Sequence, residues 1–287
     1  MTRPHSEFLD SMIGVKIPVL DHGFIIVRDY MGVDRSIADA ARVSYGDGTR
    51  TVNDDTNLIR YLVEHQHSSP LEMCEIKLHI KLPLFVARQW IRHRTANVNE
   101  ESARYSVMCK EFYTPSAQDM AQQSTNNKQG RGEALTPEQA GRAADKIESF
   151  SRIARFNYES LLNEEALARE LARMNITLNY YTQWVWKCDL RNLLHFLKLR
   201  MDPHAQLEIR KYAKEIWRIV EGWVPAAAEA FEEYELHATK FSAMETELLK
   251  RLLPSTIPPE IESLVASWKP RQKAAFLAKI GINEKGS

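Results

Sequence analysis

Hydrophobic and polar positions follow two different periods in the first part of the chain. Residues 23–27 form a short β-branched run, and residues 75–82 alternate polar and apolar side chains, so both predict strands. Residues 34–42 resemble a capped helix, and residues 57–65 repeat apolar side chains at helical spacing. Strands and helices therefore alternate in this part of the sequence.

The next element is predicted from a proline. Pro83 stops the second strand and suits a first helical turn, which leaves the missing proline N–H unused. The helix would cover residues 84–93. Four of its apolar side chains would be buried: Leu84, Phe85, Trp90 and Ile91.

The sequence after residue 114 predicts a polar excursion followed by helices. Residues 115–140 contain almost nothing to bury and are expected to be exposed. Residues 142–250 read almost entirely as helix, with Asp189 as the cap of a helix over residues 190–200. Asp202-Pro203, a cap residue followed by a first-position proline, would begin another helix.

Together these elements predict an α+β fold with an α/β-type core. A small, mostly antiparallel sheet would pack against helices, and the C-terminal half would be helical. We expect one domain over residues 1–242, including the excursion at 115–140. Residues 243–287 form a C-terminal extension to which the sequence assigns no role.

Composition narrows the class of protein. The 38 Lys and Arg residues balance 38 Asp and Glu residues, whereas nucleic-acid binding favours a surplus of cations. Cys74, Cys109 and Cys188 are odd in number and form no CxxC pair, which favours reduced thiols. The first ten residues lack the apolar run of a signal peptide, and no stretch approaches the ~20 apolar residues that cross a bilayer. We therefore expect a cytoplasmic protein without membrane association.

Candidate chemistry is densest in residues 92–105. In a helix over residues 84–93, Gln89, Arg92 and His93 would share one face. Cations at a helix C-terminus can simply complement the helix dipole. That explanation does not account for the loop that follows, which carries many donors and acceptors: Asn97, Asn99, Glu100, Ser102, Arg104 and Tyr105. The combination favours a binding site for an anion and a planar ring.

Three further groups could contribute. His65 and His67 could be metal ligands, but no spacing of the HExxH type supports this, and a His-Ser-Ser-Pro loop touching a ligand is favoured. Arg200 and His204 flank a predicted helix break, where side chains can converge. Arg173 stands in an apolar context, where a half-buried arginine would need an anionic partner.

Two other functions could use the same residues, namely a serine hydrolase and a nucleic-acid-binding protein. A serine hydrolase would use Ser102 with His93 and Glu100, but the G-x-S-x-G elbow is absent. A nucleic-acid-binding protein would stack bases on aromatic side chains beside the arginines. The zero net charge and the expected burial of these aromatics count against it: Trp90, Tyr105, Trp184 and Trp186.

The motifs resemble those of the flavin-dependent thymidylate synthases. The signature is Arg-His-Arg, seven residues and then Ser, which spans residues 92–102. Residues 67–72, 99–106 and 189–206 fit the same pattern in order and spacing, and the resemblance covers roughly residues 23–229. It implies methylation of dUMP to dTMP with methylenetetrahydrofolate, and with NADPH as reductant through FAD. It also implies a homotetramer with active sites between subunits.

The resemblance further implies site residues, none of them metal ligands. Contacts to FAD would come from Ser69, Arg92, His93, Arg94, Glu100, Asp189, Arg191 and His195. Contacts to dUMP would come from Gln89, Arg92, Glu100, Glu101, Ser102, Ala103, Arg104, Arg173 and Arg200. Arg200 would be the catalytic residue that activates the pyrimidine, and Ser102 would position the substrate. Asp189 and His195 depart from relatives that carry asparagine there. The alternative is a non-catalytic nucleotide- or RNA-binding protein.

Overall fold

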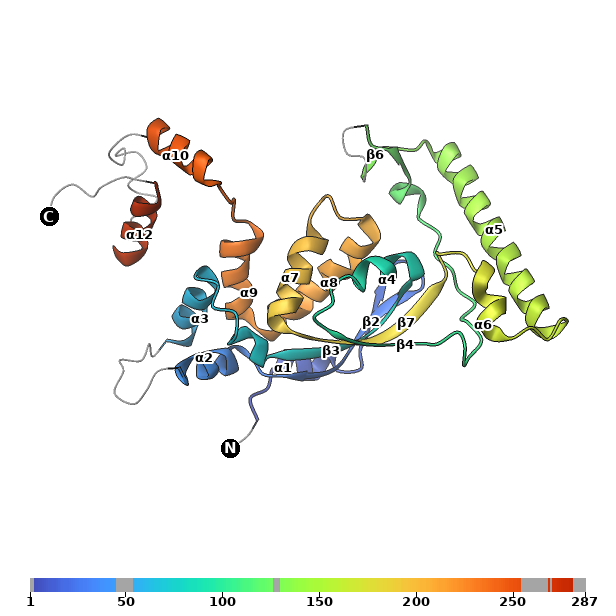
Figure 1. The fold of residues 1–287 in the computed structure, drawn as a ribbon, viewed down its shortest axis with the longest axis horizontal. Coiled ribbons are helices and arrows are strands. Elements are labelled where there is room, and N and C mark those ends of the chain that lie inside the picture. Colours follow the sequence, from blue (N-terminus) through green and yellow to red (C-terminus); the bar gives the residue numbers. More distant parts are fainter. Residues whose placement is uncertain (1–2, 45–53, 126–129, 254–267, 269, 281–287) are drawn as a thin grey trace. The chain divides into compact units, whose positions relative to one another are not determined.

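The computed structural model describes residues 3–44, 54–125, 130–253, 268 and 270–280 (Figure 1). Its helices are α1 (Glu7–Met12), α2 (Asp34–Arg42), α3 (Asp55–Glu64), α4 (Leu84–Trp90), α5 (Pro137–Asn163), α6 (Arg169–Ala172), α7 (Leu190–Met201), α8 (Leu207–Trp223), α9 (Pro225–Phe231), α10 (Ala243–Leu252) and α12 (Pro270–Ile280). Its strands are β1 (Lys16–Val19), β2 (Gly23–Met31), β3 (Glu75–Pro83), β4 (Asn97–Glu100), β5 (Ala121–Gln123), β6 (Arg131–Ala134) and β7 (Tyr181–Asp189).

A five-stranded antiparallel sheet with the order β1-β2-β3-β7-β4 forms the centre of the fold. The alternation predicted for residues 75–82 is present in β3, where apolar side chains are buried and the polar ones between them are half-buried. Strand β7 pairs with β3 over its whole length, from Pro83↔Tyr181 to Glu75↔Asp189. The predicted α+β class is confirmed.

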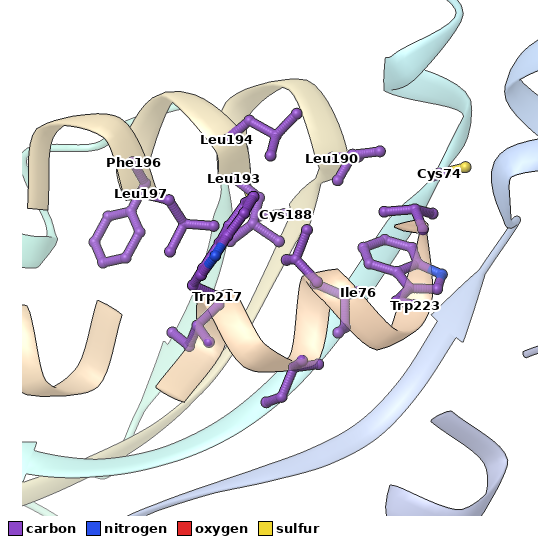
Figure 2. Close-up of a cluster of buried hydrophobic side chains, with 14 of the residues drawn as sticks. Cys74, Ile76, Cys188, Leu190, Leu193, Leu194, Phe196, Leu197, Trp217 and Trp223 are labelled. Carbon is purple, nitrogen blue, oxygen red and sulfur yellow. The ribbon is translucent and has the colours of Figure 1, made fainter. Parts of the chain in front are cut away.

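Helices α7 and α8 cover the buried face of this sheet (Figure 1). Figure 2 shows Leu193 and Leu197 of α7 and Trp217 of α8 meeting over Cys188 and Ile76 of the strands. Fully burying a large apolar side chain stabilises a fold by about 1.5–3 kcal/mol. This contact layer therefore holds α7, and the polar residues on its outer face, in a fixed place against the sheet.

The prediction of almost continuous helix over residues 142–250 is wrong at β7. Residues 181–189 alternate buried and less buried side chains, with Trp184 and Trp186 facing the core. Aromatic and β-branched residues favour a pleated surface, and pairing on both sides makes β7 an interior strand of the sheet. Strands β3 and β7 together bridge the two halves of the chain.

Two helix boundaries also differ from prediction. Helix α4 ends at Trp90, so Ile91 is 45% exposed rather than buried. Helix α8 begins at Leu207, not at Asp202-Pro203. The reason is local, because the carboxylate of Asp202 accepts hydrogen bonds from the backbone and the ring of His204 at 2.8 Å. The predicted cap of α7 is confirmed, since Asp189 accepts from the Asn192 N–H at 2.9 Å.

The excursion carries more structure than its composition suggests. It contains the hairpin β5–β6, and Met120 is only 7% exposed. Helix α5 begins inside the predicted excursion, where the N-cap Thr136 and Gln139 form a capping box and Pro137 is the first helical residue. The expectation of an exposed segment is correct for most of its described residues, but wrong at Met120 and Ala140.

The chain divides into two compact units, residues 1–236 and residues 237–287. The second contains α10 and α12, and the rings of Trp268 and Phe276 lie 5.3 Å apart within it. The division at residue 242 stays a prediction. No helix in the described part of the chain combines the length and apolar character of a membrane span.

Candidate active site

The segment from Arg92 to Tyr105 passes along two hollows in the first unit. It leaves α4, turns, and enters β4, which pairs with β7 from Asn97↔Lys187 to Glu100↔Trp184. The part before β4 lines one cavity together with α7. The part at the end of β4 and beyond lines a second cavity beside α6. The candidate residues are therefore divided between two places.

The first cavity, here called the histidine cavity, has a volume of about 300 Å³. Its lining combines cations, imidazoles and an apolar wall: Arg92, His93, Arg94, Thr95, Trp186, Cys188, Asn192, His195, Leu199 and Arg200. Five of the residues predicted from the sequence thus meet in one place. Guanidinium groups can bind phosphate oxygens, and the wall can contact a planar ring.

His93 and Arg200 are joined directly in this cavity. The Nε of Arg200 donates a hydrogen bond to Nε2 of His93 at 2.9 Å. Burial, with help from the neighbouring Arg200 and His195, lowers the pKa of His93 to about 4. Burial also lowers the pKa of Arg200. At neutral pH His93 is therefore an uncharged acceptor, with its remaining proton on Nδ1, and it orients a cation.

Two aromatic side chains, Phe196 and Trp90, support the His93 ring. The ring meets Phe196 edge-on at 4.9 Å between centroids, and Phe196 packs on Trp90 at 4.5 Å. The predicted burial of Trp90, Trp184 and Trp186 is confirmed, whereas Tyr105 is 79% exposed and that prediction is wrong. The edge-on contact with Phe196 restricts the orientation of the half-buried His93 ring and keeps it beside Arg200.

The second cavity, here called the serine cavity, has a volume of about 500 Å³. Its lining includes Glu100, Glu101, Ser102, Ala103, Glu170, Arg173 and Thr182. Arg173 is exposed in the described chain, so the expected half-burial is wrong. Arg104 lies close by and pairs with Glu170 at 3.4 Å. The serine cavity thus offers a hydroxyl and an accessible guanidinium for an anionic ligand.

Within the described residues, the Ser102 hydroxyl is not hydrogen-bonded to His93 or Glu100. Its hydroxyl oxygen accepts a hydrogen bond from the Arg104 N–H at 3.3 Å. His93 lines the other cavity and is bonded to Arg200. Glu100 accepts a hydrogen bond from Thr182 at 2.7 Å. The three members of the hypothetical triad therefore make different contacts, which argues against the serine hydrolase.

The other predicted residues lie around these cavities. Gln89 donates to the side chain of Gln206. Asp189 is engaged by Asn192, through the backbone N–H at 2.9 Å and the side-chain amide at 2.8 Å. Arg191 lines a small hollow beside Ser68, and Ser69 is exposed next to it. Glu101 accepts from the Gln183 amide at 3.0 Å.

The candidate histidines His65, His67 and His204 contact neighbouring side chains. His65 and His67 stack with Tyr61, with centroids 4.1 and 5.9 Å from its ring. Within the described ranges, no group of three His, Cys, Asp or Glu side chains could hold a metal ion. His204 is hydrogen-bonded to Asp202 and is absent from the lining of the histidine cavity, and its convergence with Arg200 on a ligand stays a prediction.

Sequence reasoning missed two site residues. Asn192 lines the histidine cavity one helical turn before His195, and that spacing is itself a readable signal. Thr182 lines the serine cavity and binds Glu100. Its signal was the alternation in residues 181–189, which the helical interpretation of this region concealed.

The fold is a helix-covered sheet with two cavities whose linings are suited to anionic, planar ligands. A family model described as "Thymidylate synthase complementing protein" matches residues 26–226. A flavin-dependent thymidylate synthase from Ruegeria pomeroyi is 58% identical over 239 residues, 82% of this chain and 79% of its own length. One from Gluconobacter oxydans is 54% identical over 254 residues, 88% of this chain and 84% of its own length.

A solved structure agrees with these relatives. A UMP/dUMP methylase from Streptomyces cacaoi, bound with 5-Br dUMP, has a TM-score of 0.68 and 28% sequence identity. The match covers 76% of this chain and 98% of that chain. The chain belongs to the flavin-dependent thymidylate synthase family, enzymes that methylate dUMP to dTMP. The predicted family, enzyme class and function are thereby confirmed.

Proposed function

We propose that this chain makes dTMP from dUMP with FAD as its flavin, NADPH as reductant and methylenetetrahydrofolate as one-carbon donor. The observation that carries the proposal is the bonded pair of His93 and Arg200 inside a cavity lined by further cations. A generic anion site would need only the cations. A neutral imidazole that orients a half-buried guanidinium is better suited to an electron-rich ring.

The donor set of the histidine cavity fits a flavin dinucleotide. Arg92 and Arg94 are exposed guanidiniums that can bind the diphosphate, while Trp186 and Leu199 supply an apolar wall. His195 of α7 is part of the same lining, Arg191 lines the small hollow beside Ser68, and Asp189 caps α7. His93, Ser69 and Glu100 are the remaining proposed contacts. When bound, the flavin supplies the hydride that completes the methyl group.

Arg200 is the proposed catalytic residue. Its guanidinium would lie against the carbonyl and imide edge of the uracil and stabilise the negative charge that develops on the ring. The hydrogen bond to His93 occupies Nε and leaves the terminal nitrogens for the substrate. Burial raises the electrostatic effect of this charge because less water screens it.

The proposed dUMP contacts are divided between the two cavities. Arg92 and Arg200 line the histidine cavity, and Ser102 and Arg173 line the serine cavity, but the two cavities share no lining residue. One nucleotide can contact both sets if each active site combines the histidine cavity of one subunit with the serine cavity of another. This division supports the proposed homotetramer with sites between subunits. Gln89, Glu100, Glu101, Ala103 and Arg104 complete the proposed dUMP contacts.

The proposed compartment is the cytoplasm. Cys74 and Cys188 are buried, and burial raises the pKa of the Cys109 thiol. All three cysteines are free thiols, as expected in a reducing compartment.

The absorption spectrum of the purified protein tests the flavin directly. The protein is expected to be yellow, or to become so after incubation with FAD and removal of the excess. A preparation that stays colourless after this treatment would contradict the proposed cofactor. Adding dUMP, methylenetetrahydrofolate and NADPH to the yellow protein should then yield dTMP.

A further inference from the structure

The polar excursion is fixed to helix α8 by a compact set of charged contacts, here called the latch. Its members are Asp119 and Arg131 of the excursion and Glu208 and Lys211 of α8. Arg131 pairs with Glu208, and Lys211 Nζ lies 2.6 Å from Asp119 Oδ2. Arg131 also donates to the backbone carbonyl of Asp119 at 2.7 Å. Each side of the latch therefore contributes one acidic and one basic side chain, and the two ion pairs cross between the excursion and α8.

Glu208 is the buried centre of the latch. It is 1% exposed, and it is the only charged residue classed as buried in the described part of the chain. Its Oε1 accepts from Arg131 and from the Tyr113 hydroxyl at 3.1 Å, while Oε2 has no partner among the described residues. A buried carboxylate with one engaged oxygen depends on its cation. Arg131 therefore determines how Glu208 is held.

Two contacts lead from this centre to α4. The ring of Tyr113 lies 5.9 Å from the ring of Phe85, in the first turn of α4. Gln206 precedes α8, two residues before Glu208, and its side chain accepts from Gln89 in the last turn of α4. The start of α8 is thus bound on one side by the excursion and on the other by a proposed dUMP contact.

We propose that the latch positions the side-chain amide of Gln89, the group that would contact dUMP. Glu208 is the central positioning residue, and Gln206 is the last residue of the chain of contacts that leads to Gln89. This inference rests on the proposed function, because it takes Gln89 as a contact of dUMP. Arg131 fixes Glu208, Glu208 fixes the first turn of α8, and that turn presents Gln206 to Gln89. The excursion, which the sequence left without a role, would then govern the affinity for dUMP rather than the chemical step.

The test compares steady-state kinetics of the full-length enzyme with saturating FAD. Arg131→Met removes the charge and keeps an apolar stem, and Arg131→Lys restores the charge. We expect Arg131→Met to raise KM for dUMP roughly 5- to 20-fold with kcat within about twofold, and Arg131→Lys to recover most of the loss. Arg142→Met is the matched control, since Arg142 pairs with Glu138 on the exposed side of α5. It should match the wild type.

A double-mutant cycle separates positioning from loss of stability. Gln206→Leu removes the last link and should raise KM for dUMP to a similar extent, with an unchanged melting temperature. If both residues act through one path, the double variant should be little worse than either single variant. Fully additive effects, or a fall in melting temperature with unchanged KM in Arg131→Met, would overturn the latch. Should Arg131→Met not fold, Lys211→Met at the outer end of the latch gives the same comparison.

The same assay distinguishes failure of the latch from failure of the proposed function. A wild type that forms dTMP, combined with an unchanged KM in both Arg131→Met and Gln206→Leu, overturns the latch alone. A wild type that forms no dTMP overturns the proposed function, and the role of Gln89 with it.

Discussion

The Nε of Arg200 donates to Nε2 of His93 at 2.9 Å, across 107 positions of sequence. The contact joins the signature segment after α4 to the last turn of α7. It makes the histidine of the Arg-His-Arg motif an acceptor, although its neighbours in sequence are both cations. In the motif, two exposed arginines therefore flank one neutral histidine that is hydrogen-bonded to a third arginine, Arg200.

The stability of the protein should depend on His93 between pH 6.5 and pH 4. The pKa of His93 is lowered to about 4, so in this range the unfolded chain binds a proton that the folded chain does not. Stability from this group is complete above pH 6.5 and is lost as the pH falls toward 4. His93→Gln keeps an acceptor for Arg200 but does not titrate. From pH 7 to pH 5, the wild type should lose about 1 kcal/mol more than His93→Gln, after allowance for solvent screening.

Urea unfolding at the two pH values measures this difference. Equal losses in the wild type and in His93→Gln would mean that His93 titrates normally. The description of His93 as a neutral acceptor would then be wrong.

Replacing Ser102 should weaken the enzyme without abolishing it. The hydroxyl of Ser102 accepts a hydrogen bond within its own turn, and no His or carboxylate is hydrogen-bonded to it in the described chain, so we expect it to be a positioning group. Ser102→Ala removes about one hydrogen bond to the ligand, which corresponds to roughly 2- to 10-fold in kcat/KM. Steady-state assays with dUMP check this. Complete loss of turnover with intact dUMP binding would instead support a nucleophilic serine.

Asp189 should act through the stability of α7. Both of its oxygens are bonded to Asn192, and asparagine caps helices nearly as well as aspartate. Asp189→Ala should cost about 1 kcal/mol of stability, whereas Asp189→Asn should keep both stability and FAD content. Thermal unfolding and flavin absorbance measure the two effects. Loss of FAD in a fully stable Asp189→Asn variant would show a direct flavin contact.

Local patterns were sufficient to predict several elements of the fold. The strand over residues 75–82 and the Asp189 cap depend on neighbours in sequence, and both are present. Strand β7 was missed because its identity depends on pairing with β3 and β4. Its alternating aromatic residues were visible, but the helices on both sides dominated the interpretation. Helix α8 starts late because Asp202 binds His204 rather than capping a helix.

In the site, too, the features set by neighbours in sequence could be predicted, and those set by packing between distant segments could not. Arg92, His93 and Arg94 of the signature motif line one cavity with Arg200. The bond between His93 and Arg200 could not be predicted, because it depends on how α7 packs over the sheet. The separation of Ser102 from His93 was equally hidden, since only the path of β4 places them in different cavities.

Turnover by Arg200→Ala tests the central claim most directly. dTMP formation and flavin absorbance should be measured together, with Arg218→Ala as control because Arg218 forms an exposed pair with Glu215 on α8. We predict that Arg200→Ala retains FAD and loses at least about 10²-fold in kcat, the effect of removing a preorganised charge from a developing anion. Arg218→Ala should resemble the wild type. An Arg200→Ala enzyme that binds FAD and forms dTMP at the wild-type rate would contradict the account.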